Sequence, residues 1–127
     1  MAQKINLLVD TDVFIDYFNH HLFRDHFESE RFRVYYSVVT KKELLSKEGL
    51  TQSEQAEIRR FLRQCRIIPL DRSILKKYGQ LRQEYPALGK EDCLIAATAI
   101  AKKFPLATRN IRHFQVINGL KLHFLEN

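Results

Sequence analysis

Apolar and polar positions alternate along the chain with two periods, one typical of strands and the other of helices. Compact apolar or β-branched runs that end at polar turn residues predict five strands, at 4–9, 33–39, 66–70, 104–108 and 120–125. Apolar residues recur at helical spacing between these runs. They predict helices at about 13–23, 53–65, 72–85, 91–103 and 110–114, and one more that begins at Thr40.

Strands that alternate with helices are typical of a parallel sheet covered on both faces. We therefore expect the α/β class, as a three-layer α/β/α sandwich around a central, mainly parallel sheet of four or five strands. A length of 127 residues suits a single domain over 1–127.

Composition narrows the class of protein. With 45% hydrophobic and 28% charged residues, the chain has the values of an ordinary globular protein. The apolar run from Ile5 to Val9 is too short for a membrane span or a signal-peptide core. The two cysteines, Cys65 and Cys93, cannot make a disulfide framework and fit a reducing compartment. We expect a cytoplasmic protein with no membrane contact.

Charge is distributed unevenly. The net charge is +6, but residues 1–58 carry −3 and residues 59–127 carry +9. An acidic half joined to a basic half is compatible with a metal site beside a phosphate-binding surface, and equally with ordinary surface chemistry. The segment from Arg59 to Arg66 places four arginines around an apolar helical stripe. Its ordinary explanation is a solvated face; the alternative is a role in binding RNA or a partner.

Acidic and amide side chains follow several of the predicted strands. Asp10 ends the first strand, Glu43 lies just past the second, and Asn110 follows the fourth. Asp92 sits in the first turn of the helix at 91–103. Ligands of open α/β sheets gather outside the carboxyl ends of the strands, so these side chains are expected to meet there. A hard divalent cation would relieve the repulsion between carboxylates.

Each of these residues also has a purely structural explanation. Glu43 completes a Thr-x-x-Glu capping box with Thr40, and Asp92 suits a helix N-terminus. Asn110 is a good N-cap for the short helix after it, and Asp12 is an N-cap for the first helix. Asp10 is harder to explain structurally, because a carboxylate directly after a buried strand needs a partner.

Four segments, in this order, resemble the motifs of PIN-domain ribonucleases, and in particular the VapC-like toxins of toxin–antitoxin pairs. They are Leu7-Leu-Val-Asp-Thr-Asp-Val-Phe-Ile-Asp16, Ser37-Val-Val-Thr-Lys-Lys-Glu-Leu-Leu45, Asp92-Cys-Leu-Ile-Ala-Ala-Thr-Ala99 and Ala107-Thr-Arg-Asn-Ile-Arg-His-Phe114. The resemblance covers nearly the whole chain. It implies a PIN-like fold.

The resemblance also implies metal-dependent endonucleolytic cleavage of RNA. Asp10 and Asp92 would bind Mg²⁺ or Mn²⁺, Glu43 would orient or deprotonate the attacking water, and Asn110 would belong to the same catalytic group. Substrate contacts are expected from Thr11, Thr108, Arg109 and Arg112. Loops or single strands of RNA are the expected substrates, because an A-form duplex hides its base edges. A small antitoxin protein and a homodimer are the partners that the resemblance implies.

The chain departs from the family pattern in its fourth motif. The family often has another acid there, and this chain has Asn110 and His113 at the two usual positions. This departure puts a second metal ion in doubt and leaves open a PIN-like module that binds RNA with weak or no cleavage. A further alternative reads Asp10-Thr-Asp12 as the signature of haloacid-dehalogenase-like phosphatases, with Asp10 as nucleophile. That reading predicts a later lysine and usually a cap domain.

Overall fold

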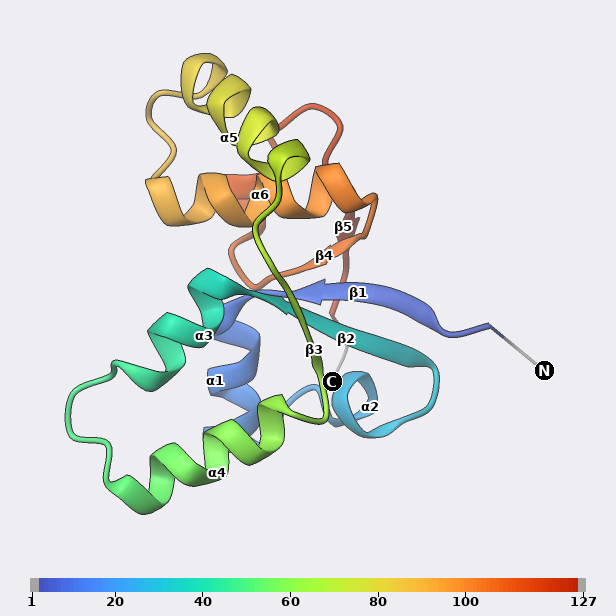
Figure 1. Ribbon diagram of the computed structural model, residues 1–127. Coiled ribbons are helices and arrows are strands. Elements are labelled where there is room, and N and C mark those ends of the chain that lie inside the picture. The colour runs from blue at the N-terminus through green and yellow to red at the C-terminus, as the bar shows by residue number, and fades with distance from the viewer. Residues whose placement is uncertain (1–2, 126–127) are drawn as a thin grey trace.

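The computed structural model describes residues 3–125 and contains a five-stranded sheet between two layers of helices (Figure 1). The strands are β1 (Ile5–Val9), β2 (Phe32–Ser37), β3 (Arg66–Ile68), β4 (Leu106–Ala107) and β5 (Leu122–His123). The helices are α1 (Thr11–His20), α2 (Arg24–Glu28), α3 (Val38–Leu45), α4 (Gln52–Leu62), α5 (Arg72–Glu84), α6 (Lys90–Lys102) and α7 (Ile111–Phe114). The sheet order is β3-β2-β1-β4-β5, and every neighbouring pair is parallel. The predicted three-layer α/β class is confirmed.

Side chains of the central strand β1 alternate between two apolar cores. Leu7 and Val9 face the core that α1, α2 and α4 cover, whereas Leu8 faces the core formed by α5, α6 and α7. All three side chains are essentially inaccessible to solvent. Because both faces of the strand are buried, its sequence is continuously apolar except at Asn6, as parallel strands require. The two layers of helices that the sequence predicts therefore come from the alternation within one strand.

Two helices differ in position from the sequence-based prediction. The first predicted helix, 13–23, corresponds to α1 alone, which ends at His20 where His21 and Phe23 adopt left-handed backbone conformations. Helix α2, at Arg24–Glu28, is not predicted. The predicted helix beginning at Thr40 starts earlier, at Val38, with Ser37 as its N-cap. Apolar spacing alone reveals neither a left-handed residue nor the side chain that caps a helix.

Two predicted helix caps are wrong, and the correction matters for the site. Thr40 lies inside α3, so it does not form a capping box with Glu43. The first helix is capped by Asp10, whose carboxylate accepts a hydrogen bond from the Thr11 amide, and not by Asp12. Asn110 does occupy the N-cap position of α7, but its side chain makes no capping hydrogen bond. Glu43 and Asp12 thus do not make the caps that their spacing suggests, whereas Asp10 does cap a helix.

The parallel arrangement places all strand ends of one kind at the same edge of the sheet. In Figure 1, the arrowhead of β1 points toward the side where α3 and α6 begin, and this side is the carboxyl edge. The amino ends of the strands lie at the opposite edge, where α6 ends. Each edge collects residues from distant parts of the sequence.

Candidate active site

Asp10 is a buried carboxylate at the end of β1. Its side chain is 6% exposed and accepts two hydrogen bonds, from the Thr11 amide and the Thr108 hydroxyl, each of 2.8 Å. Burial raises the pKa of Asp10 from 3.8 to about 6, against the lowering effect of the two hydrogen bonds. The nearby charges of Asp12 and Asp92 raise it further. The site therefore holds a carboxylate in surroundings that disfavour its negative charge.

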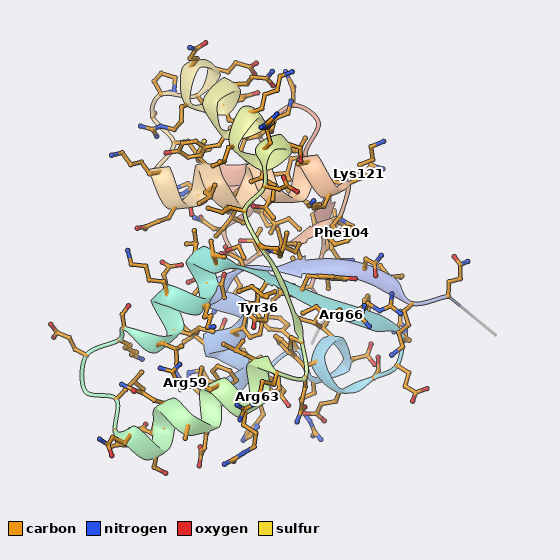
Figure 2. All side chains as sticks on the ribbon, viewed as in Figure 1. Tyr36, Arg59, Arg63, Arg66, Phe104 and Lys121 are labelled. Atoms are coloured by element: carbon orange, nitrogen blue, oxygen red, sulfur yellow. The ribbon has the colours of Figure 1, made fainter. Side chains whose placement is uncertain are left out.

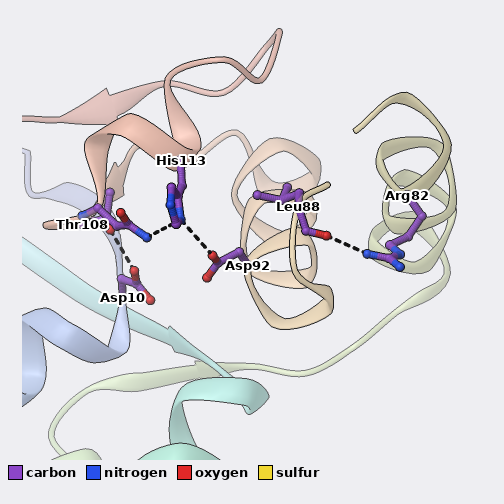
Figure 3. A network of polar contacts seen from close by, with 7 residues as sticks. Asp10, Arg82, Leu88, Asp92, Thr108 and His113 are labelled. Atoms are coloured by element: carbon purple, nitrogen blue, oxygen red, sulfur yellow. Dashed lines mark hydrogen bonds and ion pairs between the residues drawn. The ribbon is translucent and has the colours of Figure 1, made fainter. Parts of the chain in front are cut away.

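Asp92 approaches the same space from the first turn of α6. Figure 3 shows Asp10 and Asp92 facing a common region beneath His113, with Thr108 behind Asp10. Partial burial raises the pKa of Asp92, while His113, whose Nδ1 lies 3.7 Å from Asp92 Oδ2, opposes that shift. Because each aspartate raises the pKa of carboxyls near it, a positive ion between them would be favourable.

Glu43 lies in the last turn of α3 and is connected to this region through Thr11. The Thr11 hydroxyl donates to Glu43 Oε1 at 2.7 Å and lies 3.0 Å from Thr40 Oγ1. Thr11 and Thr40 are both buried. Because Thr11 directly follows Asp10, one short segment positions two of the three expected acids. Sequence reasoning missed Thr40; the signal was a threonine inside an otherwise apolar stretch, Val38-Val-Thr40.

The segment after β4 supplies the remaining expected side chains. Thr108 is buried against Asp10, and its hydroxyl also accepts a hydrogen bond from the Asn110 amide. The Asn110 side-chain amide lies 2.7 Å from Nδ1 of His113. Arg109 forms an ion pair with Asp16 of α1, whereas Arg112 is exposed and has no ion pair among the described residues. Asn110 thus lies beside the acids without adding a charge to them.

The carboxylates at this site are compatible with a hard cation that takes few of its ligands from the protein and the rest from water. Within residues 3–125, no three histidine, cysteine, aspartate or glutamate side chains stand close enough to enclose an ion by themselves. Two carboxylates, Asp10 and Asp92, face one region, and Mg²⁺ typically uses one or two carboxylates while retaining several waters. A hollow of about 410 Å³ is lined by Asn110, and another of about 500 Å³ by Glu43; neither is lined by Asp10 or Asp92. The residues present fit such an ion.

Comparison with known proteins agrees with this geometry. The chain matches the PIN domain family over residues 7–120 and belongs to that family. It is 30% identical to ribonuclease VapC1 of Methanocaldococcus jannaschii, over 95% of this chain and 89% of the relative. Its fold is similar to a chain of the VapBC2 complex of Rickettsia felis bound to a promoter DNA fragment. That match has a TM-score of 0.82 and 25% identity, and covers 96% of this chain and 100% of the other.

A second solved structure extends the comparison. A chain of a toxin–antitoxin complex from Klebsiella pneumoniae is 28% identical, with a TM-score of 0.75 over 90% of this chain and 94% of that one. Membership of the PIN family excludes the dehalogenase-like reading of Asp10-Thr-Asp12, since a single sheet and its helices take up residues 7–120. None of the helices within residues 3–125 combines the length and apolarity that a membrane span needs.

Proposed function

We propose that this protein is a divalent-metal-dependent endoribonuclease and the toxin component of a toxin–antitoxin pair. One observation carries the proposal: a carboxylate that is 6% exposed, Asp10, shares an open region with Asp92, and its pKa is raised to about 6. Asp10 also caps α1, but burying its charge beside Asp92 costs folding stability, and a bound cation would offset that cost. The ribonuclease relative and the toxin–antitoxin neighbours support the same conclusion.

Asp10 and Asp92 would hold Mg²⁺ or Mn²⁺. When bound, such an ion supplies Lewis-acid chemistry, acidifying water and offsetting the charge that develops on phosphoryl oxygens. Glu43 orients the attacking water and accepts its proton. The reaction breaks an RNA phosphodiester by in-line attack and leaves a 5′-phosphate and a 3′-hydroxyl. Asn110 accepts or donates hydrogen bonds beside the acids and adds no charge.

The two threonines expected to contact substrate receive a different role in this proposal. Thr11 and Thr108 are 6% and 1% exposed, and their hydroxyls are engaged by Glu43 and Asp10. We assign them to positioning these carboxylates. Arg112, which is exposed and unpaired among the described residues, contacts RNA phosphate. Arg109 contributes less, because its charge is already offset by Asp16. Single-stranded RNA or an exposed loop is the proposed substrate.

A groove between α1, α3 and α4 is the proposed docking surface for a segment of the antitoxin. It encloses about 610 Å³, and its apolar lining includes Ile15, Phe18 and Phe61. Glu48, Glu54 and Glu57 at the same groove favour a partner segment that combines apolar and basic side chains. The proposal includes a homodimer and a cytoplasmic location, both of which rest on the family.

Replacing Asp92 by Asn tests the proposed reaction. It removes a charge while keeping the shape, so cleavage of single-stranded RNA in Mg²⁺ or Mn²⁺ should fall by at least about 100-fold. Glu91→Gln is the matched control, because Glu91 is exposed in the same turn of α6 and the charge change is the same. Undiminished cleavage by the Asp92 variant would refute the assignment.

Measuring RNA binding in parallel distinguishes the nuclease from a second candidate function, a module that binds RNA without cutting it. Asn110, where the family often has an acid, is the observation that favours a module that binds RNA without cutting it. If the unmodified chain binds RNA but shows no turnover at any Mg²⁺ or Mn²⁺ concentration, that alternative replaces the nuclease.

A further inference from the structure

The amino edge of the sheet carries a cation at the start of every strand. Lys4 directly precedes β1, Arg33 is the second residue of β2, and Arg66 is the first residue of β3. Lys103, the C-cap residue of α6, lies three residues before β4, and Lys121 directly precedes β5. We call these five residues the amino-edge strip. Arg66 and Lys121 lie on the same side of the molecule in Figure 2, Lys121 near the end of α6 and Arg66 lower in the view, nearer α2.

The strip follows from the parallel topology. Backbone hydrogen bonds join the strand starts, from the Ile5 amide to the Arg31 carbonyl and from the Leu106 amide to the Lys121 carbonyl. The register of the sheet staggers these starts: Ile5 pairs with Phe32, whereas Arg66 pairs with Tyr35, and both Tyr35 and Leu106 pair with Leu8. Cations that are widely separated in the sequence are thereby brought to one side of the sheet, with Lys4 outermost and Arg66 level with Leu8.

None of the five cations has an ion pair among residues 3–125. Among carboxylates of neighbouring segments, Asp25 is neutralised by Arg31 and Asp71 by Lys102, whereas Glu30, two residues before β2, is exposed and has no ion pair among residues 3–125. Four of the strip residues are exposed, and Arg33 is half-buried. Five cations still outnumber this acid, so the strip favours an anionic partner with several charges.

The strip also has concave and aromatic features. A pocket of about 260 Å³ lies between the starts of β1, β2 and β3; Lys4, Arg33 and Arg66 line it, and no carboxylate does. The half-buried rings of Tyr35 and Phe104 contact each other nearby, with centroids 4.7 Å apart. Cations interleaved with aromatic rings are typical of surfaces that bind single-stranded nucleic acid.

We propose that the amino-edge strip binds the phosphodiester backbone of single-stranded RNA at a distance from the bond that is cut. The proposal rests on the proposed function, since it gives the same substrate a second contact surface. The five residues of β1, rising about 3.3 Å each, separate Lys4 from Asp10 by roughly 16 Å. Arg66 lies two strands away from β1 and level with Leu8. Only an RNA of several nucleotides reaches from the acids to Lys4, and several separated charges suit a polymer better than a single small anion.

The test is the salt dependence of RNA binding by a triple variant, Lys4→Gln, Arg66→Gln and Lys121→Gln. Each phosphate contact contributes about 0.7 to the slope of log K against log salt for single strands. In a chain that also carries Asp92→Asn to prevent cleavage, we expect the triple variant to lower this slope by about 2 for a long RNA. Without the Asp92 change, cleavage of an RNA too short to reach the strip should stay unchanged.

The matched control is Lys47→Gln, Arg72→Gln and Lys76→Gln, which removes the same charge from exposed positions outside the strip. All substituted residues in both variants are exposed, and thermal unfolding checks that both remain folded. An unchanged slope for the strip variant, or an equal change in the control, overturns the proposal. Displacement of RNA by polyglutamate as effectively as by unlabelled RNA also overturns it, and assigns the strip to an acidic peptide.

The outcome is distinguishable from a failure of the proposed function. If the unmodified chain cleaves no RNA but the strip variant alone loses the salt-dependent binding, the strip is supported and the nuclease is not. If short RNA is cleaved and the slope does not change, the nuclease stands and the strip falls.

Discussion

The two edges of the sheet carry opposite charge in opposite surroundings. At the carboxyl edge, Asp10 is 6% exposed and is held by hydrogen bonds from Thr11 and Thr108. At the amino edge, Lys4 and Arg66 are exposed and unpaired among the described residues. Each buried charge at the carboxyl edge lowers folding stability and is held in one position. Each solvated charge at the amino edge costs little folding stability and contributes independently to binding. The two edges should therefore respond differently to substitution.

The largest expected effect is at Asp10. Asp10→Asn should lower RNA cleavage by at least about 100-fold, because it removes a charge that faces the proposed ion. The same change should stabilise the metal-free protein at mildly alkaline pH. The folded pKa of about 6 lies above the ordinary value of 3.8, so this group's contribution to stability is complete below 3.8 and is lost as pH rises through about 6. The loss is at most about 3 kcal/mol.

Denaturant unfolding with a chelator, below and above this pH range, measures the effect. Asp25→Asn, at an exposed carboxylate of α2, is the control and should keep the pH dependence of the unmodified chain. If the unfolding free energy of the Asp10 variant falls with rising pH as much as that of the unmodified chain, burial of Asp10 is not the cause of the pH dependence. Adding Mg²⁺ should stabilise the unmodified chain and not the Asp10 variant.

A smaller effect is expected at Thr11, which fixes Glu43 without carrying a charge. Thr11→Val keeps the shape and removes the 2.7 Å hydrogen bond to Glu43. Cleavage should fall about 10- to 100-fold, the usual range for a residue that orients a functional carboxylate. Thr11→Ser, which retains the hydroxyl, should recover most of the activity. If Thr11 instead contacted RNA directly, Thr11→Val would raise KM and leave kcat unchanged.

The smallest of these effects is expected from adding a charge at the carboxyl edge. Asn110→Asp restores an acid where the family often has one, and it lies beside His113 near Asp92. We expect the Mg²⁺ concentration for half-maximal cleavage to fall by a factor of about 3 to 10, through added attraction for the ion. Gln115→Glu, at an exposed position just after α7, is the charge-matched control. Equal shifts in both variants would indicate a general charge effect.

Most of the fold could be predicted from periodicity. All five strands overlap the apolar runs that predict them, and for the central strand β1 the reason is burial on both faces, which requires a nearly continuous apolar sequence. The end of α1 and the separate helix α2 could not be predicted, since they depend on left-handed residues at His21 and Phe23, and neither is glycine. The N-cap of α3 was assigned wrongly because Thr40 and Glu43 have the spacing of a capping box.

For the site, the sequence predicted which residues lie at the carboxyl edge, but not how they are held. Asp10, Glu43 and Asp92 come from β1, α3 and α6, and topology alone brings them to one edge. The hydroxyl contacts of Thr11 with Glu43 and of Thr108 with Asp10 depend on side-chain geometry. A sequence motif gives no direction for a hydroxyl, which is why these threonines were expected to contact substrate.

Helix α3 joins the two halves of the interior. Val39 near its start packs in the same core as α5 and α6, whereas Leu44 near its end packs in the core of α1 and α4. Glu43 lies between these two anchoring points. A volume change in either core would therefore tilt α3 and displace the Glu43 carboxylate. Core substitutions far from the site should consequently reduce cleavage more than they reduce folding stability.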